Sequence, residues 1–339
     1  MPTWSGTGAG PCKQARAPPM NATTAPARIL VTGADGFVGR HLLRTLRTAF
    51  PSAVLIACAQ APDLADADTT LPLDLLSTDS IAECLTQARA DAIVHLAAAT
   101  VVPQSFADPG LTWRVNVDGT LTLARMLMAS APETRLLFVS SAETYGLTFQ
   151  RGEPLDEDAP FAPANPYAAS KAAADLALGE MALRGLKVIR MRTANHTGPG
   201  QSDALVVPAF ARQIARIEAG RQEPVIKVGA LDRWRDFLDV RDVCAAYAAV
   251  LNHEVTPGTA FNIASGTPRR IGDVLDALVA RSAVPVEVRT DEARLRPTDV
   301  VKAIVNPGRS KAMLGWEPRI PWDETLDSVL ADWRAREKV

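Results

Sequence analysis

A chain of 339 residues, 47% of them hydrophobic and 22% charged, has the composition of a soluble globular protein with one large domain or two closely joined domains. Its formal net charge of −2 excludes the strongly basic surface of a protein that coats nucleic acid. No apolar run reaches the roughly 18 residues that a membrane-spanning helix needs, so we expect no membrane segment.

Cysteine and histidine residues are few and widely spaced. Neither type forms the close pairs that hold metal ions, so no metal site is predicted. The scatter of the cysteines predicts reduced thiols in a cytoplasmic protein rather than a disulfide framework. The residues concerned are Cys12, Cys58, Cys84, Cys244, His41, His95, His196 and His253.

The first 27 residues are rich in Pro, Ala, Gly and Thr and show no periodicity. They lack the apolar segment of a signal peptide, and we interpret residues 1–27 as a disordered tail. Met20 is an alternative start of translation, because periodic sequence begins only at Arg28.

A strand, a glycine loop and a helix follow one another without a gap. Residues 28–32 (RILVT) are a run typical of a buried strand, residues 33–39 (GADGFVG) carry three glycines, and residues 37–49 have the periodicity of an amphipathic helix. Glycines in a G-x-x-G-x-x-G spacing let the backbone approach a pyrophosphate at the amino end of the helix, which predicts a dinucleotide-binding loop. The predicted cofactor-binding residues of this loop are Gly33, Asp35, Gly36, Phe37, Val38 and Gly39.

Apolar strands and helices then alternate along the chain. Strands are predicted at residues 53–59, 71–75, 92–97, 135–141 and 186–192, and helices at 78–89, 111–130 and 167–184. This alternation predicts an α/β fold with a doubly wound parallel sheet, in which ligands bind beyond the carboxyl ends of the strands. Further cofactor contacts are predicted at these ends, from Asp74 (at the adenine edge), Leu75, Leu96, Ala97 and Ala98.

The preference between the two nicotinamide dinucleotides depends on the end of the second strand. Residues 59–61 (AQA) lack the acidic side chain that would bind the ribose 2′-hydroxyl of NAD and repel a 2′-phosphate. Arg40 is the nearest cation that could hold that phosphate, although a solvated helix arginine is an equally good interpretation. We expect NADP(H) or NAD(H), with NADPH slightly favoured.

Tyr167 and Lys171 lie four residues apart at the start of a predicted helix, so both side chains point to one face. An ammonium beside a phenol favours the phenolate and is expected to lower the pKa of Tyr167. Ser141 ends the strand at 135–141, about 26 residues before the tyrosine, and is placed to bind a substrate oxygen. These three residues are predicted to form a proton relay for hydride transfer to a carbonyl.

Beyond residue 194 the chain is predicted to form a smaller α/β domain that holds the substrate. Helices are predicted at 205–219, 271–281 and 322–336, and strands at 224–228 and 261–264, with a strand at 236–240 leading into a helix that ends near 252. The predicted dinucleotide-binding domain covers residues 28–194, and residues 236–266 are expected to return to it. The predicted substrate domain consists of residues 195–235 and 267–339. Arginines cluster in the second domain at 233 and 235, 269 and 270, and 294 and 296. Each of these arginines fits a solvated surface, but a diphosphate substrate would explain several at once.

The motifs TGADGFVG, HLAA, SSAETYG, NPYAASK and NHTGPGQ together resemble those of the extended short-chain dehydrogenase/reductase family. The resemblance runs from Arg28 almost to the carboxyl terminus. It implies a Rossmann fold, a nicotinamide cofactor and Ser141, Tyr167 and Lys171 as the catalytic residues.

More narrowly, VVPQSFADP, RQIARIEAG, VGALDRWRDFLDVRD and RLRPTDV resemble the GDP-4-keto-6-deoxy-D-mannose reductases, which form GDP-D-rhamnose. This resemblance implies a GDP-sugar substrate and a homodimer or a pair of dimers, built through the helices near 111–130 and 167–184. It also implies substrate contacts from Ser141, Asn195, the backbone near Val206, Arg235, Arg296, Pro297, Thr298 and Asp299; relatives often carry Glu at the last of these positions.

Two alternatives remain open. GDP-mannose 4,6-dehydratases share the sheet and the catalytic trio but need a further carboxylate for elimination of water, and Glu143 occupies a suitable position. The dehydratases carry Thr where Ser141 stands and a different glycine loop, which favours the reductase. A non-catalytic dinucleotide sensor is the third interpretation, and the complete trio argues against it.

Overall fold

The computed structural model describes residues 25–59, 64–294 and 300–338. Its centre is a seven-stranded sheet with the order β10-β6-β5-β4-β1-β2-β3, in which all neighbours are parallel. The predicted doubly wound sheet is therefore confirmed. Its strands are β1 (Arg28–Thr32), β2 (Val54–Cys58), β3 (Thr69–Leu71), β4 (Ala92–His95), β5 (Arg135–Ser141), β6 (Val188–Thr193) and β10 (Ala260–Ile263).

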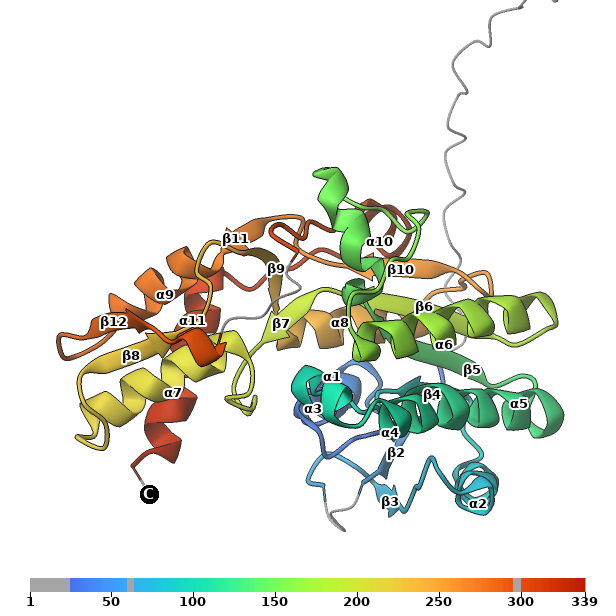
Figure 1. Cartoon of the computed structure of the whole chain (residues 1–339). Coiled ribbons are helices and arrows are strands. Elements are labelled where there is room, and N and C mark those ends of the chain that lie inside the picture. Colours follow the sequence, from blue (N-terminus) through green and yellow to red (C-terminus); the bar gives the residue numbers. More distant parts are fainter. Residues whose placement is uncertain (1–24, 60–63, 295–299, 339) are drawn as a thin grey trace, which may run out of the picture.

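Helices cover both faces of this sheet (Figure 1). On one face α1 (Phe37–Ala49) and α8 (Val240–Leu251) pack against the strands through one apolar core. On the other face α2 (Thr78–Ala88), α5 (Thr120–Ser130) and α6 (Pro166–Leu183) form a second core. Because β1, β2, β4, β5 and β6 are apolar on both sides, each of these strands contributes alternate side chains to the two cores.

The segment before α5 is more irregular than the continuous helix predicted at 111–130. It consists of α3 (Val102–Ala107), α4 (Pro109–Trp113) and a π-helical segment at Arg114–Gly119, which runs directly into α5. A second correction concerns β3, which ends at Leu71 instead of residue 75. Proline has no N–H to donate to a ladder, and Pro72 follows immediately.

Apart from α8, β10 and α10, which lie with the large sheet, the elements after β6 form a smaller group beside it, at the left in Figure 1. One small sheet has the order β11-β9-β7, and another pairs β12 with β8. A third apolar core lies among α7, α9 and α11. The bounds are β7 (Asn195–Thr197), α7 (Val206–Glu218), β8 (Val225–Val228), β9 (Trp234–Asp239), β11 (Pro268–Arg270), α9 (Ile271–Val279), β12 (Glu287–Thr290), α10 (Gly308–Leu314) and α11 (Trp322–Arg336).

Within the described residues, no helix has the length and apolarity needed to cross a membrane, and no group of three or more His, Cys, Asp or Glu side chains could hold a metal ion. Cys58, Cys84 and Cys244 are free and buried. Three predictions lie outside the described residues: the tail up to residue 24, residues 60–61 after β2, and the substrate segment at 296–299.

Candidate active site

The loop between β1 and α1 leaves no room for a side chain at its first and last glycines. Gly33 has a φ of +67°, and a Cβ placed on it would lie 3.0 Å from the backbone of Ala97 after β4. A Cβ on Gly39 would lie 2.4 Å from the carbonyl oxygen of Gly33. Gly36 precedes α1 and provides no side-chain cap, so the amino end of the helix keeps N–H groups without an intrahelical partner. These residues fit the diphosphate of a dinucleotide.

Thr32 and Asn116 fix the chain that follows β4. The Thr32 hydroxyl accepts a hydrogen bond from the Ala97 N–H at 3.1 Å, beside the predicted contacts Leu96 and Ala98. Asn116, fully buried in the π-helical segment, accepts from the Ala99 N–H at 2.7 Å and donates to Ser170 in α6 at 2.9 Å. Sequence reasoning missed Asn116, because no short spacing connects it to either partner.

The predicted adenine contact, Asp74, lies in an exposed turn beyond β3. Its carboxylate already accepts a hydrogen bond from the Leu76 N–H at 2.9 Å, while Leu75 is buried in the core. Arg40 is exposed, and its Nε donates to the backbone oxygen of Asp35 at 2.9 Å. Arg40 therefore borders the glycine loop, and both side chains are exposed and without a buried structural role.

The start of α6 is set by Asn165. Its side-chain oxygen accepts from the Ala168 N–H at 2.7 Å, and Pro166 occupies the first turn, as expected for a helix start. The Asn165 amide also donates to Glu143 Oε2 at 3.1 Å. One residue thereby caps the helix and holds the carboxylate that follows β5.

Ser141, Tyr167 and Lys171 meet at the junction of β5 and α6. Tyr167 is hydrogen-bonded to the Ser141 side chain, and the Ser141 hydroxyl also accepts from the Glu143 N–H at 3.1 Å. Lys171 is buried, and its Nζ donates to the carbonyl oxygen of Val139 at 2.8 Å. The strand and the helix thus place a hydroxyl, a phenol and an ammonium at one carboxyl edge of the sheet.

The pKa of Tyr167 is raised, not lowered as the sequence suggested. Burial is the largest cause, the charge of Glu143 adds to it, and the hydrogen bond from Ser141 opposes both. Burial also lowers the pKa of Lys171 to about 8, against the opposing effect of Asp175. At neutral pH the phenol is therefore protonated and available as an acid.

A buried ionic network lies behind this trio. Asp175, one helical turn after Lys171, accepts from Arg192 Nε at 3.1 Å and from Arg190 Nη1 at 2.8 Å. Arg192 also donates to the Tyr145 hydroxyl at 3.1 Å, and Tyr145 donates to Asn262 at 2.8 Å. The sequence offered no sign of this network, because its members come from α6, β6 and β10 and from the chain after β5.

The predicted substrate residues begin at the continuation of β6. Asn195 opens β7 and is exposed, Val206 opens α7, and Arg235 lies in β9. Arg235 Nη1 donates to the carbonyl oxygens of Trp234 and Val300, at 2.9 and 2.8 Å. Arg235 is thus bonded to Val300, the residue that follows the predicted substrate segment 296–299 in the sequence.

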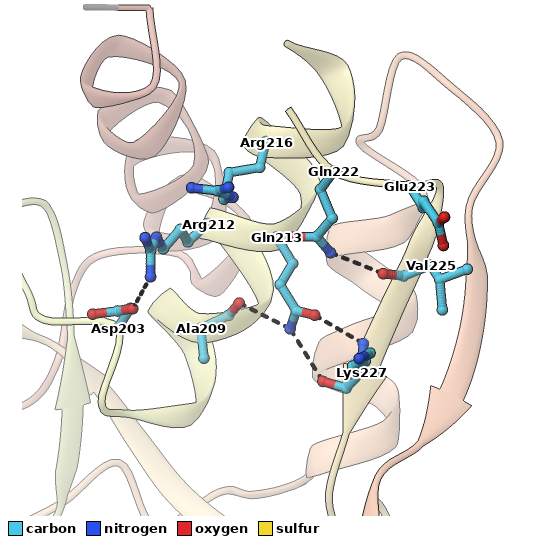
Figure 2. A pocket seen from close by; sticks show the side chains of 9 residues that line it. All are labelled: Asp203, Ala209, Arg212, Gln213, Arg216, Gln222, Glu223, Val225 and Lys227. Carbon is cyan, nitrogen blue, oxygen red and sulfur yellow. Dashed lines mark hydrogen bonds and ion pairs between the residues drawn. The ribbon is translucent and has the colours of Figure 1, made fainter. Parts of the chain in front are cut away.

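A separate pocket of about 490 Å³ lies between α7 and β8 (Figure 2). No predicted site residue lines it. Several of its polar side chains bind one another or the nearby backbone: Arg212 pairs with Asp203, and Gln213 bonds the Lys227 backbone in both directions. We assign this pocket no part in the chemistry.

Comparison with known proteins gives consistent matches over most of the chain. Residues 30–329 match the family described as GDP-mannose 4,6 dehydratase. GDP-6-deoxy-D-mannose reductase from Pseudomonas aeruginosa is 36% identical over 310 residues, which are 91% of this chain and 98% of that protein. The solved structure of RMD from Pseudomonas aeruginosa complexed with NADPH has a TM-score of 0.79 at 34% identity, covering 91% of this chain and 99% of the other. The solved structure of UDP-glucose 4-epimerase from Thermus thermophilus in complex with NAD has a TM-score of 0.79 at 26% identity. The match covers 91% of this chain and 99% of the epimerase.

Proposed function

Because the chain belongs to the GDP-mannose 4,6-dehydratase family of extended short-chain dehydrogenases/reductases, we propose that it reduces GDP-4-dehydro-6-deoxy-D-mannose to GDP-6-deoxy-D-mannose (GDP-D-rhamnose). The observation that carries this proposal is the assembled trio at the carboxyl end of β5, at the same edge of the sheet as a loop that fits a dinucleotide. The 36% identity to a GDP-6-deoxy-D-mannose reductase supports the choice of substrate.

A nicotinamide dinucleotide, NADPH in preference to NADH, supplies the hydride when it is bound in the glycine loop. Tyr167 donates its phenolic proton to the 4-keto oxygen of the sugar, and Ser141 holds that oxygen by a hydrogen bond. Lys171 keeps a positive charge beside the site, which stabilises the phenolate that remains. Gly33, Gly36 and Gly39 would hold the cofactor's diphosphate, and Asp74 and Arg40 would lie toward its adenosine end.

We propose that each of two parts of the chain binds one of the two ligands. Residues 28–194 and 236–266 would bind the dinucleotide, since β10 extends the seven-stranded sheet from β6. Residues 195–235 and 267–339 would bind the nucleotide sugar, since α7, α9 and α11 share a core of their own. The free buried cysteines support a cytoplasmic location.

The direct test offers the purified protein NADPH and a panel of 4-keto nucleotide sugars, and follows NADPH consumption and the sugar product. We expect the fastest turnover with GDP-4-dehydro-6-deoxy-D-mannose. Faster turnover of a keto sugar carried by UDP or dTDP would reject the proposed substrate. Tight NADPH binding with no turnover in the whole panel would instead support a dinucleotide sensor.

Dehydration of GDP-mannose should be slower than reduction of the keto sugar. Glu143 is the carboxylate that elimination would need, and here it accepts a hydrogen bond from the helix cap Asn165. Glu143→Gln should leave reduction within a few-fold of the parent, because reduction requires no base at that position. The exposed Glu153, changed to Gln, is the matched control. If the parent dehydrates GDP-mannose rapidly and Glu143→Gln abolishes this activity, the assignment is reversed in favour of a dehydratase.

Arg235 and Arg296 are proposed to bind the substrate's diphosphate. Arg235→Lys and Arg296→Lys should each raise the KM for the GDP-sugar, because a lysine cannot reproduce the bidentate guanidinium contact. A lost charge-assisted hydrogen bond costs roughly 1.5–3 kcal/mol. The KM for NADPH should not change, and Arg233→Lys, at an arginine paired with exposed Asp232, is the control. Unchanged KM values for the GDP-sugar in both variants would remove these arginines from the site.

Two copies of the chain are proposed to associate through α5 and α6, as a homodimer or a pair of dimers. Leu176 and Leu183 on α6 are 61% and 89% exposed, and Ala169, Ala173 and Ala177 permit close approach of a second helix. Light scattering after gel filtration at micromolar concentration should give twice or four times the monomer mass. A monomer mass would contradict this interface.

A further inference from the structure

Two arginines face each other across the small sheet that continues from the candidate active site. In the antiparallel pairing of β9 with β11, Arg235 is directly opposite Arg269. Residues directly opposite in such a pair point to the same face, with Cβ atoms about 4.5–5.5 Å apart, and like charges in these positions destabilise the sheet. An arrangement of this kind needs a compensating anion or a specific structural reason.

The surroundings of Arg269 hold its guanidinium against an aromatic ring. Its Nε is buried and has no hydrogen-bond partner among the described residues. The guanidinium carbon lies 4.8 Å from the centre of the Trp322 ring, and Trp322 itself stacks on Phe237 of β9 at 5.7 Å. Stacking on an aromatic face orients a guanidinium and leaves its N–H edge for a ligand.

The nearby carboxylates are engaged elsewhere. Asp236 and Asp323 favour the charged form of Arg269, although burial as the larger effect lowers the pKa of its guanidinium. The Asp236 carboxylate accepts from the N–H of Ser265, the hydroxyl of the same residue and the N–H of Gly266. Asp323 forms an ion pair with Arg281 at 2.6 Å. The adjacent Arg270, by contrast, is paired with Asp273 at 2.8 Å.

The position of the Arg235–Arg269 pair follows from the register of the strands. Ser141 of β5 is opposite Thr193 of β6, and the chain continues directly into β7, where Asn195 is opposite Phe237 of β9. Arg235 comes two residues before Phe237, so the parallel register puts the Arg235–Arg269 pair level with Thr193, just before β7 begins. A ligand whose reacting carbon lies at Ser141 would extend along this sheet toward the two arginines.

We propose that Arg269 is a diphosphate-binding residue that acts together with Arg235, and that the anion between them is the diphosphate of the nucleotide-sugar substrate. This inference rests on the proposed function for the identity of that ligand. Two guanidinium groups on one face can bind a diphosphate through several charge-assisted hydrogen bonds, and the diphosphate is then the compensating anion. Arg269 is thereby a determinant of nucleotide-sugar affinity that the family motifs do not include.

The test measures the affinity of the protein for GDP and for GMP by calorimetry. Arg269→Met keeps an unbranched side chain over Trp322 but removes the charge, and Arg270→Met is the matched control one residue away. We expect Arg269→Met to weaken GDP binding roughly 10- to 100-fold, as for the loss of one or two charge-assisted contacts, and to weaken GMP binding much less. Arg270→Met should bind GDP and GMP as tightly as the parent does. Neither variant should change the affinity for NADP⁺.

Unchanged GDP affinity, or an equal loss for GDP and GMP, would overturn the inference, as would a parent protein that does not bind GDP. A lower melting temperature of Arg269→Met with unchanged GDP affinity would identify Arg269 as a packing residue. If Arg269→Met does not fold, Arg269→Lys is judged by the same GDP and GMP affinities. The reductase assay is separate: a parent that binds GDP through Arg269 but reduces no GDP-sugar refutes the proposed function and leaves this inference standing.

Discussion

Tyr167→Phe should lower the kcat for keto-sugar reduction by roughly 10²–10⁴-fold, the usual contribution of a general acid. The change deletes only the phenolic oxygen that is hydrogen-bonded to Ser141. Because burial and the charge of Glu143 raise the pKa of Tyr167, the phenol is protonated at neutral pH and its proton is the one lost in the variant. The affinity for NADPH should remain close to that of the parent, which fluorescence titration can measure.

Tyr247 supplies a control for this experiment. It is also a buried tyrosine, and its hydroxyl lies 2.7 Å from the Thr193 hydroxyl at the end of β6. Tyr247→Phe should cost about 1 kcal/mol of unfolding free energy for the lost hydrogen bond and retain most of the kcat. A Tyr167→Phe enzyme with more than half of the parent kcat, or a Tyr247→Phe enzyme as inactive as Tyr167→Phe, would contradict the assignment of Tyr167 as the acid.

Asp175→Asn should lower the free energy of unfolding by about 3–5 kcal/mol, the usual cost of removing one partner of a buried ion pair. The Asp175 side chain is 0% exposed and accepts hydrogen bonds from Arg190 and Arg192. The amide would place an NH₂ group against one guanidinium and leave both arginines without the carboxylate that binds them. Denaturant unfolding followed by fluorescence measures the loss.

The exposed face of the same helix provides the comparison. Glu180 pairs with Arg184 four residues later, and both side chains are 58% exposed. Glu180→Gln should hardly change the denaturation midpoint, because solvent screens that pair. Asp175→Asn with an unfolding free energy within about 1 kcal/mol of the parent would show that the buried network stabilises the fold far less than a buried ion pair usually does.

The elements with a strong periodic pattern were predictable from the sequence. The strand at 135–141 and the helices at 37–49 and 322–336 have the predicted bounds, because apolar runs and amphipathic repeats depend on nearby residues alone. The three-residue strands β7 and β11 were not predicted, since pairing with β9 defines them. All four residues of β12 are exposed, so that strand carries no alternating pattern.

The members of the candidate site were more predictable than their electrostatics. The spacing of Ser141, Tyr167 and Lys171 reflects a strand and the crossover helix that follows it, which sequence reasoning can place. The pKa of Tyr167 depends on burial by residues from several elements, and the expected lowering was wrong because burial raises this pKa and the charge of Glu143 raises it further. Asn116 binds partners far away in the sequence, so no local pattern revealed it. The arginine cluster at 269 and 270 was visible in the sequence, but the pairing of Arg269 with Arg235 and its contact with Trp322 were not.

The cap at Asn165 also determines where the chain can tolerate changes of length. Each residue of an α-helix advances the side-chain direction by about 100°, since about 3.6 residues make one turn. A residue inserted between Asn165 and Tyr167 would rotate the phenol away from Ser141 or displace the cap. A residue inserted before Asn165 would enter the non-helical chain between Gly152 and Ala164 and leave the rotational phase of α6 unchanged. Insertions should therefore be tolerated before Asn165 and should abolish activity directly after it.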